Sequence, residues 1–145
     1  MKILIVCSGN SNKNLSPFIE EQGNSLLNLG VYIDYFLIQG HGILGYLLNL
    51  PKLFKKIREN KYDLIHAHYG LSGLFSVIPR GIPVVITFHG SDINFILERQ
   101  LSKIASRNSA ANIFVSKKTM KLMPTGNSFF IPCGVDFKIF YHFLI

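Results

Sequence analysis

The sequence Val-Val-Ile-Thr-Phe at residues 84–88 is an uninterrupted run of apolar and β-branched residues. Such a run is typical of a strand that is buried on both faces of a parallel sheet. The run stops at His89 and Gly90, and Ser91 or Asp92 could cap a helix that follows. In open α/β sheets, ligands bind beyond the carboxyl ends of the strands. A titratable ring, a small glycine and a helix start therefore mark a candidate site, although a His-Gly pair is also common in ordinary αβ connections.

Predicted strands alternate with predicted helices along the whole chain. Short apolar runs predict strands at residues 3–7, 31–38, 62–68, 84–88, 112–115 and 129–131. Helical spacing predicts helices at residues 17–29, 43–60, 70–78, 94–107 and 117–122. Ser16 and Pro17 are typical of a helix start and Gly30 of a helix end, whereas Pro51 is expected to interrupt the second helix. This alternation predicts a doubly wound parallel α/β sheet in one domain.

The composition limits the partners and the compartment. The 145 residues carry 15 Lys and Arg against 8 Asp and Glu, which gives a net charge of +7. This excess favours anionic partners, although it is equally compatible with charge that serves solubility. Cys7 and Cys133 form no disulfide or metal-ligand pattern. Because the N-terminus carries no signal-peptide pattern and no apolar stretch reaches the roughly 20 residues of a membrane span, we expect a cytoplasmic protein.

Two of the predicted helices are amphipathic. In the helix at residues 94–107, Leu97, Leu101 and Ile104 are expected to form the apolar face. In the helix at residues 43–60, basic side chains lie beside an apolar stripe: Lys52, Lys55, Lys56, Arg58 and Lys61 beside Leu53, Phe54 and Ile57. The simpler interpretation is a solvated helix face. The alternative is a surface that docks on anionic lipid.

The polar residues at the predicted strand ends leave several chemistries open. The loop after the first strand contains one glycine, Gly9, where a dinucleotide-binding fingerprint requires three, so we do not expect NAD to bind through this turn. His66 and His68 alternate along one strand and should share a face of the sheet. Together with His89 they could hold a zinc ion, but no carboxylate motif supports a metal-activated water.

A series of motifs follows the chain in a recognisable order. Tyr-Asp-Leu-Ile-His-Ala-His ends at residue 68, Val-Ile-Thr-Phe-His-Gly-Ser-Asp ends at residue 92, Ser-Lys-Lys begins at residue 116, and Ile-Pro-Cys-Gly-Val-Asp ends at residue 136. With the glycine-bearing loop after the first strand, this series resembles the N-terminal half of the GT-B glycosyltransferases of family 4. These are retaining enzymes that use nucleotide sugars. The resemblance covers the chain from residue 1 to about residue 140.

The resemblance implies a Rossmann-like fold that is one half of a GT-B enzyme. It implies that residues 1–131 form the acceptor-side domain and that residues 132–145 begin the interdomain segment. The C-terminal donor-binding domain is then expected to be absent from these 145 residues. At the hinge, Cys133 stands where the family usually has asparagine, and the chain after residue 140 also departs from the family.

The resemblance also assigns site residues. His89 matches the family's histidine that contacts the donor sugar near the reacting centre, so it is the expected catalytic residue. The expected substrate-binding residues are Gly9, His66, His68, Gly90, Ser91, Asp92 and Ser116. No metal or other cofactor is expected, because the nucleotide sugar is a substrate and because helix N-termini and basic residues can stabilise a departing diphosphate.

The expected function is that of a hexosyltransferase, which transfers a sugar to a glycan or lipid-linked acceptor, as in polysaccharide biosynthesis. We expect this chain alone to be inactive. The expected partners are the nucleotide sugar, the acceptor and an anionic membrane, at whose inner face the protein would be peripheral, but not nucleic acid. The apolar tail at residues 137–145 predicts self-association. The alternative is a non-catalytic remnant that keeps only acceptor or membrane binding.

Overall fold

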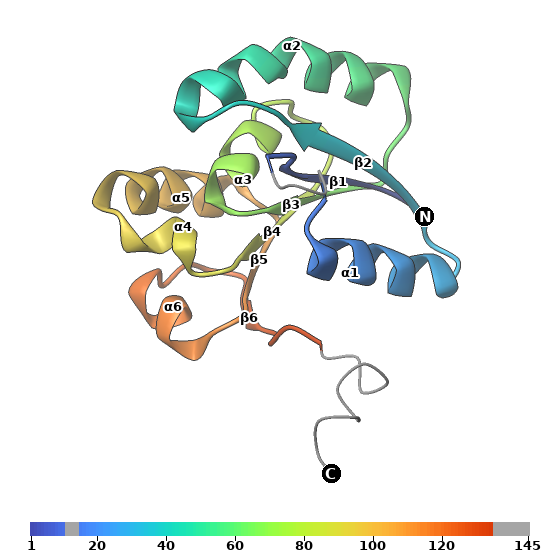
Figure 1. Cartoon of the computed structure of the whole chain (residues 1–145). Coiled ribbons are helices and arrows are strands. Elements are labelled where there is room, and N and C mark those ends of the chain that lie inside the picture. The colour runs from blue at the N-terminus through green and yellow to red at the C-terminus, as the bar shows by residue number, and fades with distance from the viewer. Residues whose placement is uncertain (11–14, 135–145) are drawn as a thin grey trace.

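Six parallel strands form one sheet in the order β2-β1-β3-β4-β5-β6 (Figure 1). The computed structural model describes residues 1–10 and 15–134, apart from the side chains of Asp92 and Asn94. The strands are β1 Lys2–Ser8, β2 Tyr32–Ile38, β3 Leu64–His68, β4 Val84–Phe88, β5 Ala111–Phe114 and β6 Ser128–Phe130. The helices are α1 Pro17–Asn28, α2 Gly42–Glu59, α3 Gly70–Ser76, α4 Ser91–Asn94, α5 Ile96–Asn108 and α6 Lys117–Leu122. The predicted Rossmann-like, doubly wound α/β architecture is therefore confirmed.

Two helix boundaries differ from the sequence-based expectation. Pro51 does not interrupt α2, which runs through it for 18 residues. Pro51 is exposed, as is Leu47, whose carbonyl group loses its helical partner, so water can supply the missing hydrogen bond. Neither Ser91 nor Asp92 caps α4, because the helix already begins at Ser91 with Gly90 as its N-cap. Gly90 has φ of 106°, a conformation that glycine adopts without steric cost, and the chain turns into the helix one residue early.

The two faces of the sheet have different covers. On one face, alternate strand residues such as Leu4, Ile65, Ile86 and Phe114 pack under α2, α3, α5 and α6. On the other face, Ile3, Ile5 and Cys7 pack against Ile19 of α1. Burial raises the pKa of the Cys7 thiol to about 12, which keeps it protonated and inert. Among the described helices, α1 alone covers this second face (Figure 1).

Small residues bring α3 close to both the sheet and α5. A Cβ atom at Gly73 would lie 2.5 Å from Ile86 Cδ1, and one at Gly70 would lie 2.7 Å from Ser102 Cβ. The buried face of α5 consists accordingly of Ser102, Ala105 and Ser106. The apolar face predicted from Leu97, Leu101 and Ile104 is not the buried face of α5, because Leu97 and Ile104 are exposed. Close backbone packing selects small side chains here rather than large apolar ones.

We predict that Gly70→Ala lowers the free energy of unfolding by about 1–3 kcal/mol, because the new methyl group overlaps Ser102 and forces α5 outward. Chemical denaturation of the 145-residue chain measures the change. Gly126→Ala is the matched control, since a Cβ at Gly126 meets nothing within 4 Å, and it should change stability by less than about 0.5 kcal/mol. Equal midpoints for both variants would contradict the tight contact between α3 and α5.

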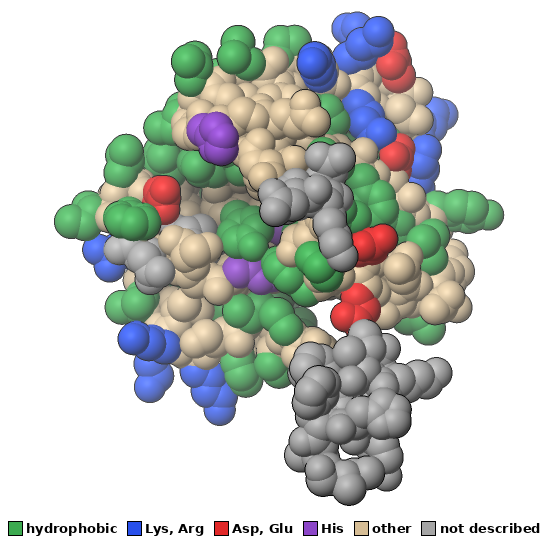
Figure 2. Space-filling view, in the orientation of Figure 1, with side chains coloured by type: hydrophobic (Ala, Val, Ile, Leu, Met, Phe, Trp, Pro, Cys, Tyr) green, Lys and Arg blue, Asp and Glu red, His purple; other side chains and the backbone are tan. Residues whose placement is uncertain are grey.

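Helix α2 carries two kinds of exposed side chain. Its inner face holds Tyr46 and Leu53, and Leu53 is only 1% exposed. Leu53 and Ile57, expected beside the basic residues on the surface, therefore face the core instead. The outer face is apolar in its first half and basic in its second half, as the green and blue side chains along the top of Figure 2 show. No helix within the described residues is long and apolar enough to cross a membrane.

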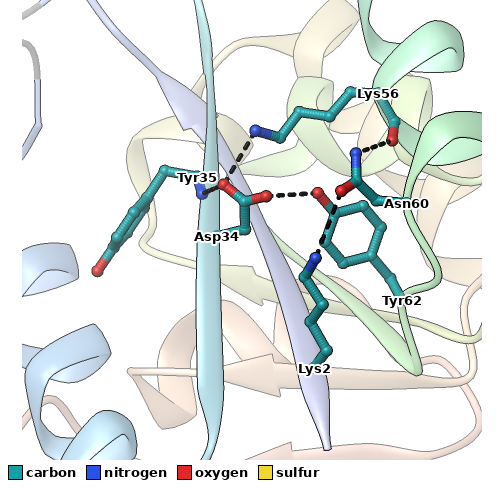
Figure 3. Close-up of polar contacts among 6 residues, drawn as sticks. All are labelled: Lys2, Asp34, Tyr35, Lys56, Asn60 and Tyr62. Carbon is teal, nitrogen blue, oxygen red and sulfur yellow. Dashed lines mark hydrogen bonds and ion pairs between the residues drawn. The ribbon is translucent and has the colours of Figure 1, made fainter.

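A polar network fastens the second half of α2 to the sheet (Figure 3). The Asp34 carboxylate of β2 accepts hydrogen bonds from Lys56 Nζ at 2.9 Å and from Tyr62 Oη at 2.6 Å. Burial raises the pKa of Asp34, but the hydrogen bonds from Tyr62 and Lys56 outweigh it, and the net pKa is lowered. Lys2 Nζ donates to Asn60 Oδ1 at 3.4 Å and lies over the Tyr62 ring. Lys56 is thus engaged within the fold, unlike Lys55 and Arg58.

Candidate functional site

A row of polar side chains crosses the middle of the α1 face of the sheet. Strand β3 pairs in parallel with β4, and His66 lies opposite Val85 while His68 lies opposite Thr87. Because strand side chains alternate, His66 and His68 share one face, and their rings stack with centroids 4.5 Å apart. The prediction that these two histidines share a face is confirmed. His89 follows β4 and stacks on His68 with centroids 5.3 Å apart.

Hydrogen bonds link the row into two pairs. His68 Nδ1 and His89 Nε2 lie 3.0 Å apart, and His66 Nε2 lies 2.8 Å from Thr87 Oγ1. In the first pair one ring must donate and the other must accept, so His68 sets which tautomer of His89 is present. His68 therefore orients His89 without itself reaching the surface, since it is fully buried.

Two aromatic rings contact His89. The Phe18 ring of α1 lies 4.8 Å from the His89 ring, and the Tyr69 ring lies 4.7 Å from it. Tyr69 has φ of 73°, which is uncommon for a bulky residue and persists only where the surrounding structure holds the backbone. Its amide donates to the Thr87 carbonyl at 2.9 Å, which fixes the turn after β3 against β4. The His89 ring is thereby held in one place.

All three histidines are neutral at pH 7. Burial lowers the pKa of His66 to about 4, and the nearby His89 adds to the effect. Burial lowers the pKa of His68 well below its ordinary value, helped by His66 and His89. Burial also lowers the pKa of His89 to about 4. The rings can hydrogen-bond as neutral imidazoles, and none adds positive charge to the site.

A pocket of about 550 Å³ opens beside His89, on the part of the sheet face that α1 leaves partly open. Its walls come from α1, from the ends of β4 and β5, and from the segment after β6. Polar groups reach it from Glu21, Gln22 and Ser25 of α1 and from Thr87 and His89. Apolar contacts are supplied by Phe18, Ile113, Val115 and Ile131. Carboxylate, amide, hydroxyl and ring groups beside apolar surface suit a ligand that carries several hydroxyl groups.

The other predicted site residues lie around this centre. The Gly9 amide donates to the Ile38 carbonyl at 2.8 Å, and a Cβ there would lie 2.9 Å from Leu37 Cβ, so this glycine serves close packing. Ser91 lines a neighbouring hollow of about 360 Å³ with Ser8, Ser16, Tyr46 and Tyr69. Gly90 turns the chain between the two spaces, and the Asp92 side chain lies outside the described residues.

Ser116 lies farther from the histidine row. Its hydroxyl accepts a hydrogen bond from the Lys118 amide at 3.2 Å and so caps α6, as the sequence predicts. Its neighbour Val115 lines the pocket of about 550 Å³, while Ser116 does not. The structure therefore brings together His66, His68 and His89, and leaves Gly9 after β1 and Ser116 after β5 in packing and capping positions.

The three-histidine zinc site has no support in the geometry. Within residues 1–10 and 15–134, no group of three His, Cys, Asp or Glu side chains is arranged to hold a metal ion. His68 and His89 direct nitrogens at each other at 3.0 Å, and His66 Nε2 is engaged with Thr87. Rings that hydrogen-bond or stack in this way do not converge on a common point as zinc ligands must.

Sequence reasoning missed the residues that hold His89. Phe18, Tyr69 and Thr87 contact the histidine row. Phe18 and Tyr69 belonged to no motif on which a functional prediction rested, and Thr87 lay inside such a motif but was given no role of its own. Alternation could have found Thr87, because residues 87 and 89 share the face of His66 and His68. No local signal in the sequence predicts that the Phe18 ring, which lies 71 positions earlier in the chain, reaches His89.

The family to which this fold and site belong is shown by comparison with known proteins. The family model of glycosyltransferase family 4 matches residues 8–138, so the chain belongs to that family. No curated protein sequence matches the chain.

Solved structures of GT-B glycosyltransferases share the fold of this chain. A part of sucrose-phosphate synthase from Thermosynechococcus elongatus matches with TM-score 0.72 and 15% identity, over 99% of this chain and 95% of that one. The longer chain of the same synthase matches with TM-score 0.75 and 15% identity, over 96% of this chain and 50% of that one. MurG from Acinetobacter baumannii matches with TM-score 0.64 and 13% identity, over 93% and 46%. The chain thus spans about half the length of these two longer structures.

We predict that acid destabilises this fold through the histidine row. Each histidine has a lower pKa folded than unfolded, so protonation favours the unfolded chain, and stability is lost as the pH falls from about 6.5 towards 4. For His66 alone, a pKa lowered from 6.5 to about 4 corresponds to roughly 3 kcal/mol once both states are protonated. Denaturation of the 145-residue chain at a series of pH values measures this loss.

A substitution pair makes this prediction specific. His66→Gln removes one titrating ring and should flatten the fall in stability between pH 6.5 and pH 4. His41→Gln is the matched control, because His41 is exposed and lies outside the row. An unchanged acid profile for His66→Gln would show that the buried row does not govern the acid sensitivity.

Proposed function

We propose that this domain is the acceptor-side half of a glycosyltransferase that uses a nucleotide sugar, and that His89 contacts the sugar being transferred. Family membership supports the transferase class. The observation that carries the role of His89 is its place: a neutral ring, in contact with Phe18 and Tyr69, at the edge of a pocket with polar walls. His89 also occupies the carboxyl edge of the sheet, where ligands bind in folds of this kind.

The neutrality of His89 suits the chemistry of sugar transfer. The bond between the anomeric carbon and the diphosphate oxygen breaks, and its electron pair leaves with the diphosphate. A bond from the acceptor oxygen to the same carbon forms, and the hydroxyl proton of the acceptor passes to the departing diphosphate. Positive charge develops on the sugar ring in the transition state, and a cationic imidazole beside it would oppose this charge. A pKa of about 4 keeps His89 uncharged at pH 7, so it can hydrogen-bond sugar hydroxyls without that repulsion.

The pocket walls offer further contacts for a sugar. Glu21, Gln22 and Ser25 lie within two turns of α1 and face the same space as His89. Carboxylate and amide groups form paired hydrogen bonds with neighbouring hydroxyls, and the apolar Phe18 and Ile113 can pack against the less polar face of a sugar ring. We assign this pocket to the acceptor or to the transferred sugar.

In this proposal, sugar transfer requires a second domain that forms the other wall of the active site. The chain covers 50% of the longer synthase chain and 46% of MurG, so its match corresponds to one half of those structures. A donor-binding domain would have to come from further residues of the same protein or from a separate subunit. Donor and acceptor must be held together in reacting geometry, and one wall supplies only part of the necessary contacts.

The finer features of the proposal follow the family. The sugar transferred is a hexose, its anomeric configuration is retained, and the acceptor is a glycan or lipid-linked sugar in polysaccharide biosynthesis. The nucleotide sugar is a substrate, and no further cofactor is required. Nuclear magnetic resonance of the fresh product would reveal the anomeric configuration, and inversion would contradict the retaining part of the proposal.

We predict that His89→Ala lowers turnover by on the order of 100-fold in an enzyme that contains both halves, because a positioned hydrogen-bonding group is lost from the reacting centre. The assay is transfer of radiolabelled sugar at saturating donor. His41→Ala is the control, because this exposed histidine precedes α2 and lines none of the three described pockets. Near-normal turnover of a folded His89→Ala enzyme would refute the assignment.

We also predict that the 145-residue chain alone binds nucleotide sugars weakly and shows no transfer above background. Calorimetry with nucleotide sugars tests the binding, and the radiolabel assay tests the transfer. Addition of a matching donor-binding domain should restore activity. Measurable turnover by the chain alone would show that these residues already form a complete site, and binding of acceptor with no restoration by any second domain would favour the non-catalytic alternative.

A further inference from the structure

Large apolar side chains are exposed in two places at the carboxyl edge of the sheet. In the first half of α2, Leu44 is 68% and Leu48 is 69% exposed, and at the start of α5, Phe95 is 69% and Ile96 is 71% exposed. A hollow of about 300 Å³ has Tyr46 of α2, Phe95 and Glu98 of α5 among its lining residues. We define this surface as the apolar rim; it consists of Leu44, Leu47, Leu48, Phe95, Ile96 and Leu97. Side chains of this size in one region mark an interaction site rather than ordinary solvent exposure.

The outer stripe of α2 changes its character along the helix. Leu44 and Leu48 are four residues apart and are followed on the same side by Lys52 and Lys55, all exposed. Arg58 extends this stripe by a further turn. The helix has 18 residues and is about 27 Å long, so its apolar half and its basic half follow one another along the same side of the helix. Figure 2 shows the two halves as adjacent green and blue groups along the top edge.

We propose that the apolar rim and the basic half of α2 together dock this domain on an anionic lipid surface. Leucine and phenylalanine side chains would enter the boundary between headgroups and acyl chains, and Lys55 and Arg58 would meet the phosphate groups. The basic residues favour lipid over a second copy of this chain, since two such stripes would repel each other across a symmetric contact.

The basic residues available for this role can be named from their contacts. Lys56 is tied to Asp34 at 2.9 Å and stays with the fold. Lys55 forms only a long contact of 3.8 Å with Glu59, and both side chains are more than half exposed. Such an exposed pair contributes little and can exchange its partner for a lipid phosphate. The lipid-facing stripe is thus different from the stripe of Leu53 and Ile57, which is buried.

The link between membrane docking and the acceptor rests on the proposed function. Phe95 of the apolar rim lines the same hollow as Ser91 and Tyr69, and Tyr69 contacts His89. A lipid-linked acceptor that extends from the membrane would therefore meet the site without leaving the lipid surface. The acceptor class implied is a sugar or alcohol on a lipid anchor.

The test uses sedimentation of the 145-residue chain with vesicles of phosphatidylcholine alone and of phosphatidylcholine mixed with phosphatidylglycerol, without any sugar. The chain should bind the mixed vesicles more tightly, and added salt should weaken this binding. Leu44→Ser with Leu48→Ser should lower the partition coefficient at least about tenfold. Leu27→Ser with Leu29→Ser is the matched control, because these exposed leucines lie on α1 and at its end, and it should bind as the parent does.

A fluorescence measurement keeps the test independent of folding defects. The chain contains no tryptophan, so Leu48→Trp introduces a single reporter. Its emission should shift to the blue and be quenched by brominated lipid, whereas Leu29→Trp should show neither effect. Absence of both effects at residue 48, or equal binding of the serine variant and its control, would overturn the proposal. So would dimerisation that depends on Leu44 and Leu48 without vesicle binding, since it would assign the rim to a second copy.

The proposed function is tested separately from the docking on lipid. Calorimetry with a nucleotide sugar on the same leucine variant should match the parent, because the substitutions leave the pocket beside His89 unchanged. Near-normal turnover of a folded His89→Ala enzyme that contains both halves would refute the role proposed for His89 and leave the vesicle result intact.

Discussion

A parallel sheet must be covered on both faces, and in the described part of this chain a single helix, α1, covers one of them. Helix α1 packs through Ile19 over β1 and β2, so the α1 face of β4 and β5 stays partly open. The opening is the pocket beside His89, and α1 forms one of its walls. The unequal cover of the sheet thus creates the site, and the histidine row occupies the boundary between the packed and the open part of the face.

The sequence predicted the strands and most helices, because buried parallel strands and capped helices leave local patterns. It also predicted that His66 and His68 share a face. It did not show which face of α5 is buried: Gly70 of α3 approaches Ser102 closely, so small residues of α5 are buried while Leu97 and Ile104 are exposed. The contacts of Phe18 and Tyr69 with His89 depend on how distant segments meet, and no local pattern encodes that. For the same reason, motif resemblance placed His89 without showing what holds it.

The helices on the opposite face explain why the apolar rim exists at all. Helix α2 reaches the core with Tyr46 and Leu53, and α5 reaches it through small residues, so neither uses its outermost apolar side chains for folding. Burying Leu44 and Leu48 in the core would require a different rotation of α2, which Gly45 opposes by its close contact with the Gly40 backbone. Apolar residues that the fold neither buries nor needs are available for a second purpose, and the basic half of α2 is consistent with lipid as their partner.

The positive charge of the chain lies away from the candidate site. Among the described residues that line the pocket beside His89, none is Lys or Arg, and the histidines next to it are neutral. A departing diphosphate carries negative charge that must be stabilised where it develops. The walls of this pocket are instead suited to hydroxyl groups, and the Gly9 amide is already engaged in the sheet. The net charge of +7 is therefore better assigned to surfaces such as α2. In the proposed function, the cationic or helix-dipole contribution to leaving-group departure would come from the donor-binding domain.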